Sequence, residues 1–178
     1  LRSIAAKHGP VALVHVDAHA DVNDEMFGER ETHGTVFRRA YEEGLINPLK
    51  TYQIGLRGTG YAATDFTEAQ GWGFQMHLAP DLWHRSLTGL GEDIRREIGE
   101  DPVYVTYDID SLDPAYAPGT GTPEIGGLTT PQAMQLIRAL NGLKIVGCDL
   151  VEVSPPYDTS GNTALTGANL LYELLCVL

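Results

Sequence analysis

The apolar run Val11-Ala12-Leu13-Val14-His15-Val16 is the feature that most limits how this chain can fold. Strands with one face in water alternate apolar and polar residues, whereas strands covered on both faces read as continuous apolar and β-branched runs. The run therefore predicts a buried strand of a parallel sheet. Similar short runs recur along the chain, at residues 52–56, 74–78, 102–107 and 144–148.

Segments of helical composition separate these runs. They cover residues 35–43, 62–69, 87–98, 131–140 and 162–175, and Thr130-Pro131 has the pattern of a helix start. Strands that alternate with helices form βαβ units. The expected fold class is therefore α/β, a three-layer α/β/α sandwich around a mainly parallel sheet. Because the chain has 178 residues, we expect residues 1–178 to form a single domain.

The composition is acidic, with 12 Lys and Arg residues against 24 Asp and Glu residues and a formal net charge of −12. This charge repels nucleic-acid phosphates and anionic lipids, so we expect neither partner and favour a small cationic molecule. No apolar run approaches the roughly 20 residues that a membrane-spanning helix needs, so we expect no membrane partner. Cys148 and Cys176 form no Cys-x-x-Cys pair and are expected to be buried, reduced thiols.

Acidic residues follow three of the expected strands, at the edge where parallel sheets bind ligands. Asp17-Ala18-His19-Ala20-Asp21 leaves the first strand, and its three potential ligands point the same way if the segment stays extended. Asp108-Ile109-Asp110 repeats the pattern after the fourth run. Clustered carboxylates need cations nearby, and oxygen ligands with imidazole suit Mn²⁺. A pair of such ions would activate water near neutral pH, which is the design of a hydrolase.

A structural explanation of the same residues competes with the metal site. Asp17 and Asp21 could cap a helix or turn, and Asp110 and Asp113 could form Asx turns before a proline. For Asp113 we prefer the turn, because Asp-Pro is itself a turn signal. His15 is in phase with Asp17, but a buried imidazole bonded to a neighbouring strand explains it equally well. His15 therefore stays outside the predicted ligand set.

His33 and Glu152 are further candidates for chemistry. His33 precedes an expected helix, where an imidazole could exchange protons near working pH. Glu152 and Asp149 lie near the end of the last strand, and we expect one carboxylate to face the cavity while the other supports it. A guanidinium would satisfy the first carboxylate through a bidentate, charge-assisted pair. An internal Arg or Lys is the alternative partner.

Four segments together resemble the ureohydrolase family of arginases and agmatinases: residues 15–21, 108–114, 119–123 and 152–155. The resemblance implies an arginase/deacetylase-like fold and a binuclear Mn²⁺ centre whose ligands are Asp17, His19, Asp21, Asp108 and Asp110. It also implies that Asp21 manages the proton passing to the leaving amine, while Glu152 holds the substrate guanidinium. By the same resemblance His33 shuttles protons, Asn23 lies on the substrate-side loop and Thr122 lies near the guanidinium.

Within the family, the resemblance is closest to the agmatinase and guanidinobutyrase branch, through residues 126–129, 154–158 and 162–165. It implies hydrolysis of agmatine to putrescine and urea, with 4-guanidinobutyrate or another linear guanidino compound as the alternative substrate. Loop charges leave this choice open, because Asp24 and Glu25 could attract an amine while Arg30 and Arg57 could receive a carboxylate. Metal-dependent deacetylation is less favoured, because an acyl-amide pocket would not need Glu152.

One family feature is missing from the sequence. The family has a further His ligand in a Gly-Gly-Asp-His segment before the first strand, and this chain has no such segment. We therefore expect the N-terminal part of the domain to be missing. If no more chain exists, we expect weak binding of the metal ion that this His would ligate. The alternative class is a truncated, non-catalytic metal-binding protein. The resemblance also implies a homo-oligomer, a trimer or hexamer, and we expect a cytoplasmic location, with an organellar targeting segment as the alternative.

Overall fold

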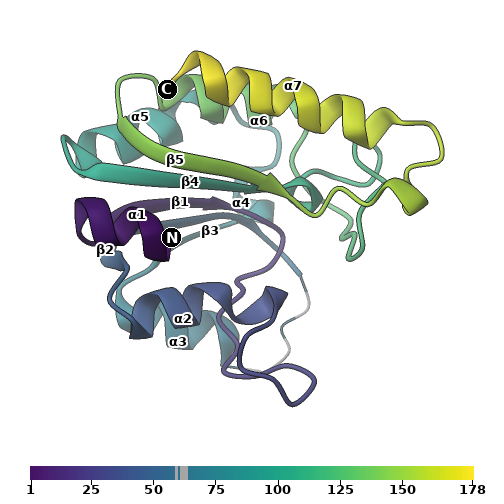
Figure 1. Cartoon of the computed structure of the whole chain (residues 1–178). Coiled ribbons are helices and arrows are strands. Elements are labelled where there is room, and N and C mark those ends of the chain that lie inside the picture. The colour runs from purple at the N-terminus through teal and green to yellow at the C-terminus, as the bar shows by residue number, and fades with distance from the viewer. Residues whose placement is uncertain (59, 61–63) are drawn as a thin grey trace.

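A parallel five-stranded sheet forms the centre of the computed structural model, which describes residues 1–58, 60 and 64–178 (Figure 1). The strands lie in the order β3-β2-β1-β4-β5, and every neighbouring pair is parallel. Their bounds are β1 Val11–Val16, β2 Ile46–Leu56, β3 Gln75–Leu78, β4 Pro102–Asp108 and β5 Lys144–Val151. The expected parallel sheet is confirmed.

Helices cover both faces of this sheet. Figure 1 places α5, α6 and α7 above it and α1, α2 and α3 below it, so the three-layer sandwich is confirmed. The helices are α1 Arg2–His8, α2 Val36–Glu42, α3 Asp65–Trp72, α4 Ala79–Leu82, α5 Thr88–Ile98, α6 Thr130–Ala139 and α7 Asn162–Cys176. Short 3₁₀ helices occupy His33–Thr35, Ile109–Ser111 and Pro155–Tyr157.

β1 lies at the centre of the sheet, and all six of its residues are buried. Val14 and Val16 pack into a cluster with residues of α5, α6 and α7, whereas Val11 and Leu13 pack into a second cluster with residues of α2. Successive side chains of a strand point to opposite faces, so covering both faces requires an apolar residue at nearly every position. This is the physical reason for the continuous run.

Four details of the elements differ from the expectations. β2 begins at Ile46, because an irregularity between its pairings at Ile46 and Thr51 accommodates the turn-like residues 47–50. α4 was not expected. The N-cap of α6 is Thr129, whose hydroxyl accepts a hydrogen bond from the Gln132 amide, and Thr130 is the first helical residue. The helix expected over residues 62–69 is α3, and residues 62 and 63 lie outside the described residues.

The carboxyl ends of β1, β4 and β5 meet at one edge of the sheet, because these three strands are parallel neighbours. Asp17 and Glu152 each follow a strand there, and Asp108 is the last residue of β4. Cys148 is half-buried and Cys176 is exposed, so the expected burial is wrong for Cys176. Among the described residues, no helix combines the length and apolar character needed to span a membrane.

Candidate metal centre

The chain turns sharply as it leaves β1, and this turn brings His19 back towards the strand. The backbone amide of His19 donates to Oδ1 of Asp17 at 2.7 Å, and Asp21 adopts a left-handed φ of 54°. The segment from 17 to 21 is therefore not extended, and the condition for a shared side-chain direction is not met. A short polar side chain that bonds the backbone two residues ahead favours a turn over a strand. The turn nevertheless keeps the three side chains close to one another.

A similar turn ends β4 and connects to the first one. Oδ1 of Asp108 accepts a hydrogen bond from the Asp110 amide at 2.8 Å, and Oδ1 of Asp110 accepts one from the Ala18 amide at 3.1 Å. Nδ1 of His19 lies 3.1 Å from Oδ2 of Asp110. Asp17 thus forms the turn of the structural explanation and Asp108 forms a further one, whereas the Asp110 carboxylate bonds the distant Ala18 amide; these bonds bring the predicted ligands together. Asp113 also forms the expected turn, accepting from the Ala115 amide at 2.9 Å.

Among the residues that the structure describes, two groups of side chains have the geometry of a metal site. In one group, the ligand atoms of Asp17, His19 and Asp110 all lie within 4.8 Å of one another. In the other, His15, Asp17 and Asp21 meet the same limit, so Asp17 belongs to both. Asp17 and Asp110 are 2% and 1% exposed. Buried carboxylates with imidazole are the ligands that suit Mn²⁺.

The pKa values of these carboxyl groups reflect their burial and mutual repulsion. Burial, followed by the charges of Asp17 and Asp110, raises the pKa of Asp108 to about 11. Burial and the charge of Asp17 likewise hold the pKa of Asp21 well above its ordinary value. Burial alone would raise the pKa of Asp17, but its interactions with His15 and His19 lower it below the ordinary range. Divalent cations would relieve this repulsion, so the donor set fits two metal ions.

The pKa of His19 is also raised, but by its acidic neighbours and not by burial. Burial would lower its pKa, but its contacts with Asp110 and Asp17 outweigh burial and raise the pKa to about 10. Nε2 of the same ring lies 3.8 Å from Oε1 of Glu124. Sequence reasoning did not single out Glu124, and its only signal was its place directly after the Gly119–Pro123 loop.

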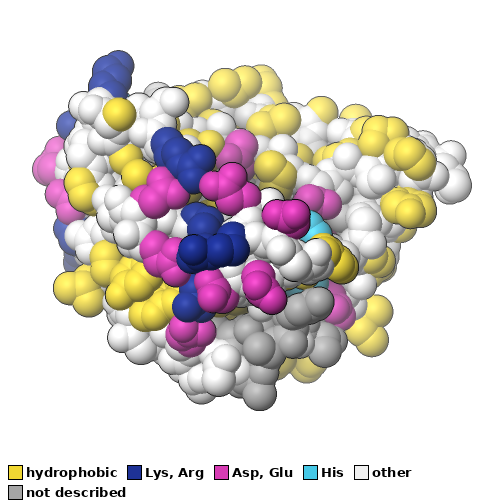
Figure 2. All heavy atoms as spheres, turned by 60° about the horizontal axis from the view of Figure 1, so that its bottom comes forward, with side chains coloured by type: hydrophobic (Ala, Val, Ile, Leu, Met, Phe, Trp, Pro, Cys, Tyr) yellow, Lys and Arg dark blue, Asp and Glu magenta, His cyan; other side chains and the backbone are white. Residues whose placement is uncertain are grey.

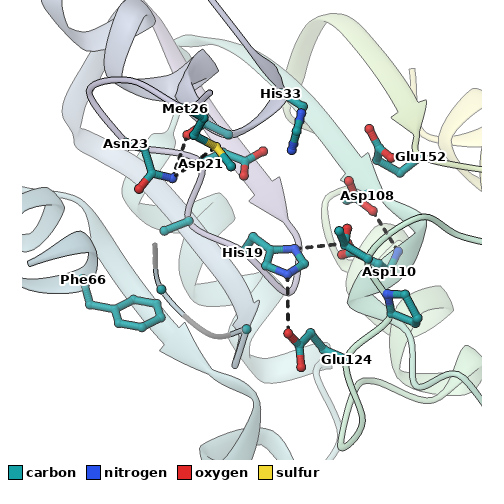
Figure 3. Close-up of a pocket in the computed structure, with 16 residues that line it drawn as sticks. His19, Asp21, Asn23, Met26, His33, Phe66, Asp108, Asp110, Glu124 and Glu152 are labelled. Atoms are coloured by element: carbon teal, nitrogen blue, oxygen red, sulfur yellow. Dashed lines mark hydrogen bonds and ion pairs between the residues drawn. The ribbon is translucent and has the colours of Figure 1, made fainter. Parts of the chain in front are cut away.

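A cavity of about 310 Å³ opens over these residues (Figure 3). Figure 3 shows Glu152 across the cavity from Asn23 and Met26, with His33 between them. Of the nine predicted site residues, eight line the cavity: His19, Asp21, Asn23, His33, Asp108, Asp110, Thr122 and Glu152. Asp17, the ninth, lines an adjoining cavity of about 270 Å³. The structure therefore brings all nine to one place.

Several of these residues are positioned by hydrogen bonds. The hydroxyl of Thr122 lies 3.3 Å from Oδ2 of Asp110, which it contacts as a donor. The side-chain amide of Asn23 donates to the carbonyl of Gly34 at 3.1 Å, and its backbone amide donates to the same oxygen at 3.0 Å. Glu152 turns into the site with a φ of 65°, a left-handed value that is uncommon outside glycine.

Asp149, three residues before Glu152, has the supporting position that was expected for one of the two carboxylates. Its Oδ2 accepts from the hydroxyl of Tyr104 and its Oδ1 from the hydroxyl of Thr106, both at 2.6 Å. Asp149 therefore finds its donors within the sheet, whereas Glu152 faces the cavity.

Ion pairs hold the cavity loop, residues 22–32, against α2. Nη2 of Arg39 lies 2.7 Å from Oδ1 of Asp24, and Arg30 lies within 3.5 Å of both Asp24 and Glu42. Figure 2 shows acidic and basic side chains interspersed on the face that carries α2 and α3. Asp24 and Arg30 are thus engaged with each other and with α2, and the expectation that they attract a substrate is not supported.

Arg57 has a role that sequence reasoning missed. All three guanidinium nitrogens donate to backbone carbonyls, whose oxygens belong to Gly55, Asp110, Ser111, Leu112, Glu124 and Ile125. The shortest of these bonds, both 2.7 Å, reach Asp110 and Glu124. Arg57 therefore ties together loops that carry site residues, and the possibility that it receives a substrate carboxylate is not supported.

Comparison with known proteins places these observations in a family. A model of the Arginase family matches residues 1–176. Guanidinobutyrase from Pseudomonas aeruginosa is 62% identical over 178 residues, which are 100% of this chain and 56% of that protein. Mitochondrial agmatinase from Gallus gallus is 56% identical over the same 178 residues, which are 52% of that protein. The chain spans about half the length of the curated relatives it matches.

Solved structures agree with the sequence matches. Proclavaminate amidino hydrolase from Streptomyces clavuligerus resembles this chain with a TM-score of 0.91 at 43% identity, over 98% of this chain and 58% of that one. The expected fold is therefore confirmed. Because the family model covers nearly all of the sequence, the chain belongs to the arginase family.

Proposed function

We propose that this chain forms the metal-dependent catalytic part of a ureohydrolase, which hydrolyses a linear guanidino compound to urea and a primary amine. The observation that carries the proposal is the convergence of Asp17, His19 and Asp110 within 4.8 Å, next to a cavity that Glu152 also lines. The names of its relatives, which include a guanidinobutyrase and an agmatinase, support the same class of reaction.

The proposed cofactor is a pair of Mn²⁺ ions held by Asp17, His19, Asp21, Asp108 and Asp110. Its fit rests on the donor set, four carboxylates and one imidazole; burial, followed by the charges of Asp17 and Asp110, raises the pKa of Asp108 in this cluster. When bound, divalent ions supply a water nucleophile near neutral pH. The ligands must be deprotonated to bind, so metal binding has to displace the proton of Asp108.

The remaining steps belong to side chains of the cavity. Glu152 holds the planar guanidinium through paired N–H donors, which orients its central carbon over the carboxylate cluster. Asp21 accepts a proton from the attacking water and passes it to the amine nitrogen as the bond between that nitrogen and the carbon breaks, so urea keeps the carbon with the oxygen from water. His33 is exposed at the cavity wall, where it can exchange protons with solvent.

Two substrates remain as candidates, and they differ in the group at the end opposite the guanidinium. The higher identity to a guanidinobutyrase than to an agmatinase favours 4-guanidinobutyrate. The cavity favours agmatine, because no Lys or Arg side chain is found among the described residues that line it, while Glu124 and Glu152 are acidic. We therefore propose a guanidino compound with a short alkyl chain as the substrate class and leave its terminal group to the experiment.

The test is a substrate panel on the intact protein loaded with Mn²⁺. We expect urea from agmatine or 4-guanidinobutyrate and little from arginine, and we expect chelation to abolish the activity. Absence of urea from every guanidino compound, with two Mn²⁺ bound per chain, would contradict the proposed reaction and favour a non-catalytic metal-binding protein. The trimer or hexamer and the cytoplasmic location stay predictions, which light scattering and fractionation address.

A further inference from the structure

A row of polar side chains crosses the interior of the sheet directly before the predicted ligands. Gln53 of β2 pairs with His15 of β1, His15 pairs with Thr106 of β4, and Thr106 pairs with Asp149 of β5. Asp17 follows His15 by two residues, so the two side chains lie on the same face of the sheet. A polar row in such a position requires a hydrogen-bond partner for each member.

The contacts of Gln53 determine the direction of the hydrogen bonds in this row. Nε2 of Gln53 donates to the carbonyl of Ala20 at 2.7 Å, which identifies it as the amide nitrogen because a carbonyl oxygen only accepts. The same Nε2 lies 3.0 Å from Nδ1 of His15, so Nδ1 accepts. The other ring nitrogen, Nε2 of His15, lies 2.7 Å from Oδ2 of Asp17 and donates to it.

Because these three residues are buried, each depends on the others for its hydrogen bonds. Gln53, His15 and Asp17 are 0%, 1% and 2% exposed, so water does not substitute for a lost partner. Oε1 of Gln53 is buried without a hydrogen-bond partner among the described residues. An unpaired buried acceptor destabilises a protein, and an apolar side chain of similar shape would avoid this cost. The two donor bonds of Gln53 are therefore the physical reason for an amide at this position.

We propose that Gln53 is a positioning residue of the metal centre, which orients His15 so that its Nε2–H holds the carboxylate of Asp17 in place. This inference rests on the proposed metal-dependent function. It assigns His15 to support and not to coordination, although its ring lies within 4.8 Å of ligand atoms of Asp17 and Asp21, because both of its nitrogens are engaged. Partners that orient ligands in this way influence metal affinity strongly.

The first test compares two glutamine substitutions on neighbouring strands. Gln53→Met removes the donors and keeps the length of the side chain, while Gln75→Met on β3 removes a bond to the Leu49 carbonyl away from the site. Calorimetric titration of the intact protein with Mn²⁺ should show binding weakened by about tenfold or more for Gln53→Met and unchanged for Gln75→Met. Equal affinities for wild type and Gln53→Met would overturn the proposal.

A double-variant cycle separates positioning from packing. His15→Gln supplies its own side-chain amide to Asp17, so the further change Gln53→Met should have little additional effect on Mn²⁺ affinity in that background. If Gln53→Met weakens binding equally in both backgrounds, its effect does not pass through His15 and the proposal fails.

A third measurement needs no substitution and no metal. Nitrogen NMR of histidine-labelled protein should find the His15 proton on Nε2 and not on Nδ1, and a proton on Nδ1 would overturn the inference even if the variants fail to fold. The outcomes also separate the two proposals: wild-type protein that binds no Mn²⁺ contradicts the proposed function, whereas the position of the His15 proton tests the arrangement in either case.

Discussion

Nδ1 of His19 lies 3.1 Å from Oδ2 of Asp110, and this contact joins the turn after β1 to the end of β4. Without metal the two groups form an ion pair, because the neighbouring carboxylates raise the pKa of His19 to about 10. Both atoms are also metal ligands in the proposed site, and a histidine binds a cation only as the neutral imidazole. Metal binding is therefore expected to replace this ion pair and to release the proton of His19.

Replacing Asp108 with asparagine should separate metal binding from folding. The pKa of Asp108 is raised to about 11, so this carboxyl is neutral in the metal-free protein at pH 7 and Asp108→Asn should fold. We expect Mn²⁺ to lose its stabilising effect and urea formation to fall by at least about a hundredfold. Melting temperature with and without Mn²⁺ and the urea assay measure both effects.

The control for this substitution is Asp93→Asn, which changes an exposed carboxylate paired with Arg96 on α5. It should leave both quantities unchanged. An Asp108→Asn protein that still binds two Mn²⁺ ions with unaltered activity would remove Asp108 from the ligand set.

The stability of the metal-free protein should fall as pH rises. Asp108 keeps its proton up to about pH 11 when folded, whereas an unfolded aspartate loses it near pH 4. The folded state thus binds more protons between these values, and stability falls as pH rises through this window. Melting curves in EDTA between pH 5 and pH 9 test the sign. With saturating Mn²⁺ the decline should disappear, and a metal-free stability that rises with pH would contradict the assignment.

Glu152→Gln should impair the use of substrate without affecting the metal. Glu152 lines the cavity and is not among the five proposed metal ligands. Loss of its charge should lower kcat/KM by about a hundredfold, because the substrate guanidinium then loses its charged partner. Elemental analysis should still find two Mn²⁺ per chain. If kcat/KM is retained, Glu152 does not hold the guanidinium.

Arg57→Met should destabilise the whole chain. The substitution leaves several backbone carbonyls without donors, including those of Asp110 and Glu124, and we expect a loss of roughly 3 kcal/mol in the free energy of unfolding. Arg96→Met, which removes an exposed ion pair on α5, should change stability little. Urea denaturation of the two variants side by side makes the comparison, and equal stabilities would refute the role of Arg57.

Asp158 should contribute stability that acid removes. Its carboxylate accepts from the backbone amides of Ala164 and Thr163 in the first turn of α7, and these bonds lower its pKa. The contribution is therefore present above the pKa of an unfolded aspartate and is lost as pH falls through the lower folded value. Asp158→Asn should lower the melting temperature near pH 7 and flatten its decline in acid. A decline as steep as that of wild type would contradict this.

The sequence was sufficient to predict the strands and the location of the site, for identifiable reasons. The run from Val11 to Val16 is apolar because both faces of β1 are covered, and a parallel sheet brings its strand ends to one edge. Asp17 and Asp110 could therefore be expected to meet. The turn between Asp17 and Asp21 could not, because an alternating pattern is compatible with both an extended and a turned backbone.

The roles of Gln53 and Arg57, which support the site, could not be predicted from the sequence for a different reason. Gln53 and Arg57 lie in or just after β2, and neither belongs to a motif. Their partners, His15 for Gln53 and the carbonyl of Asp110 for Arg57, are distant in sequence. Their roles depend on strand register and on where a loop carbonyl points, which local patterns do not encode. His15 is intermediate, since its bond to a neighbouring strand was one of two explanations and is the one found.

The single guanidinium of Arg57 touches the end of β2, the 3₁₀ helix after β4 and the loop at residues 124 and 125. If one of these three segments moves away, it loses its hydrogen bonds to Arg57, and the guanidinium that also holds the other two segments is displaced. Transient local opening should consequently involve all three together, and their backbone amides should exchange with deuterated solvent as one cooperative unit.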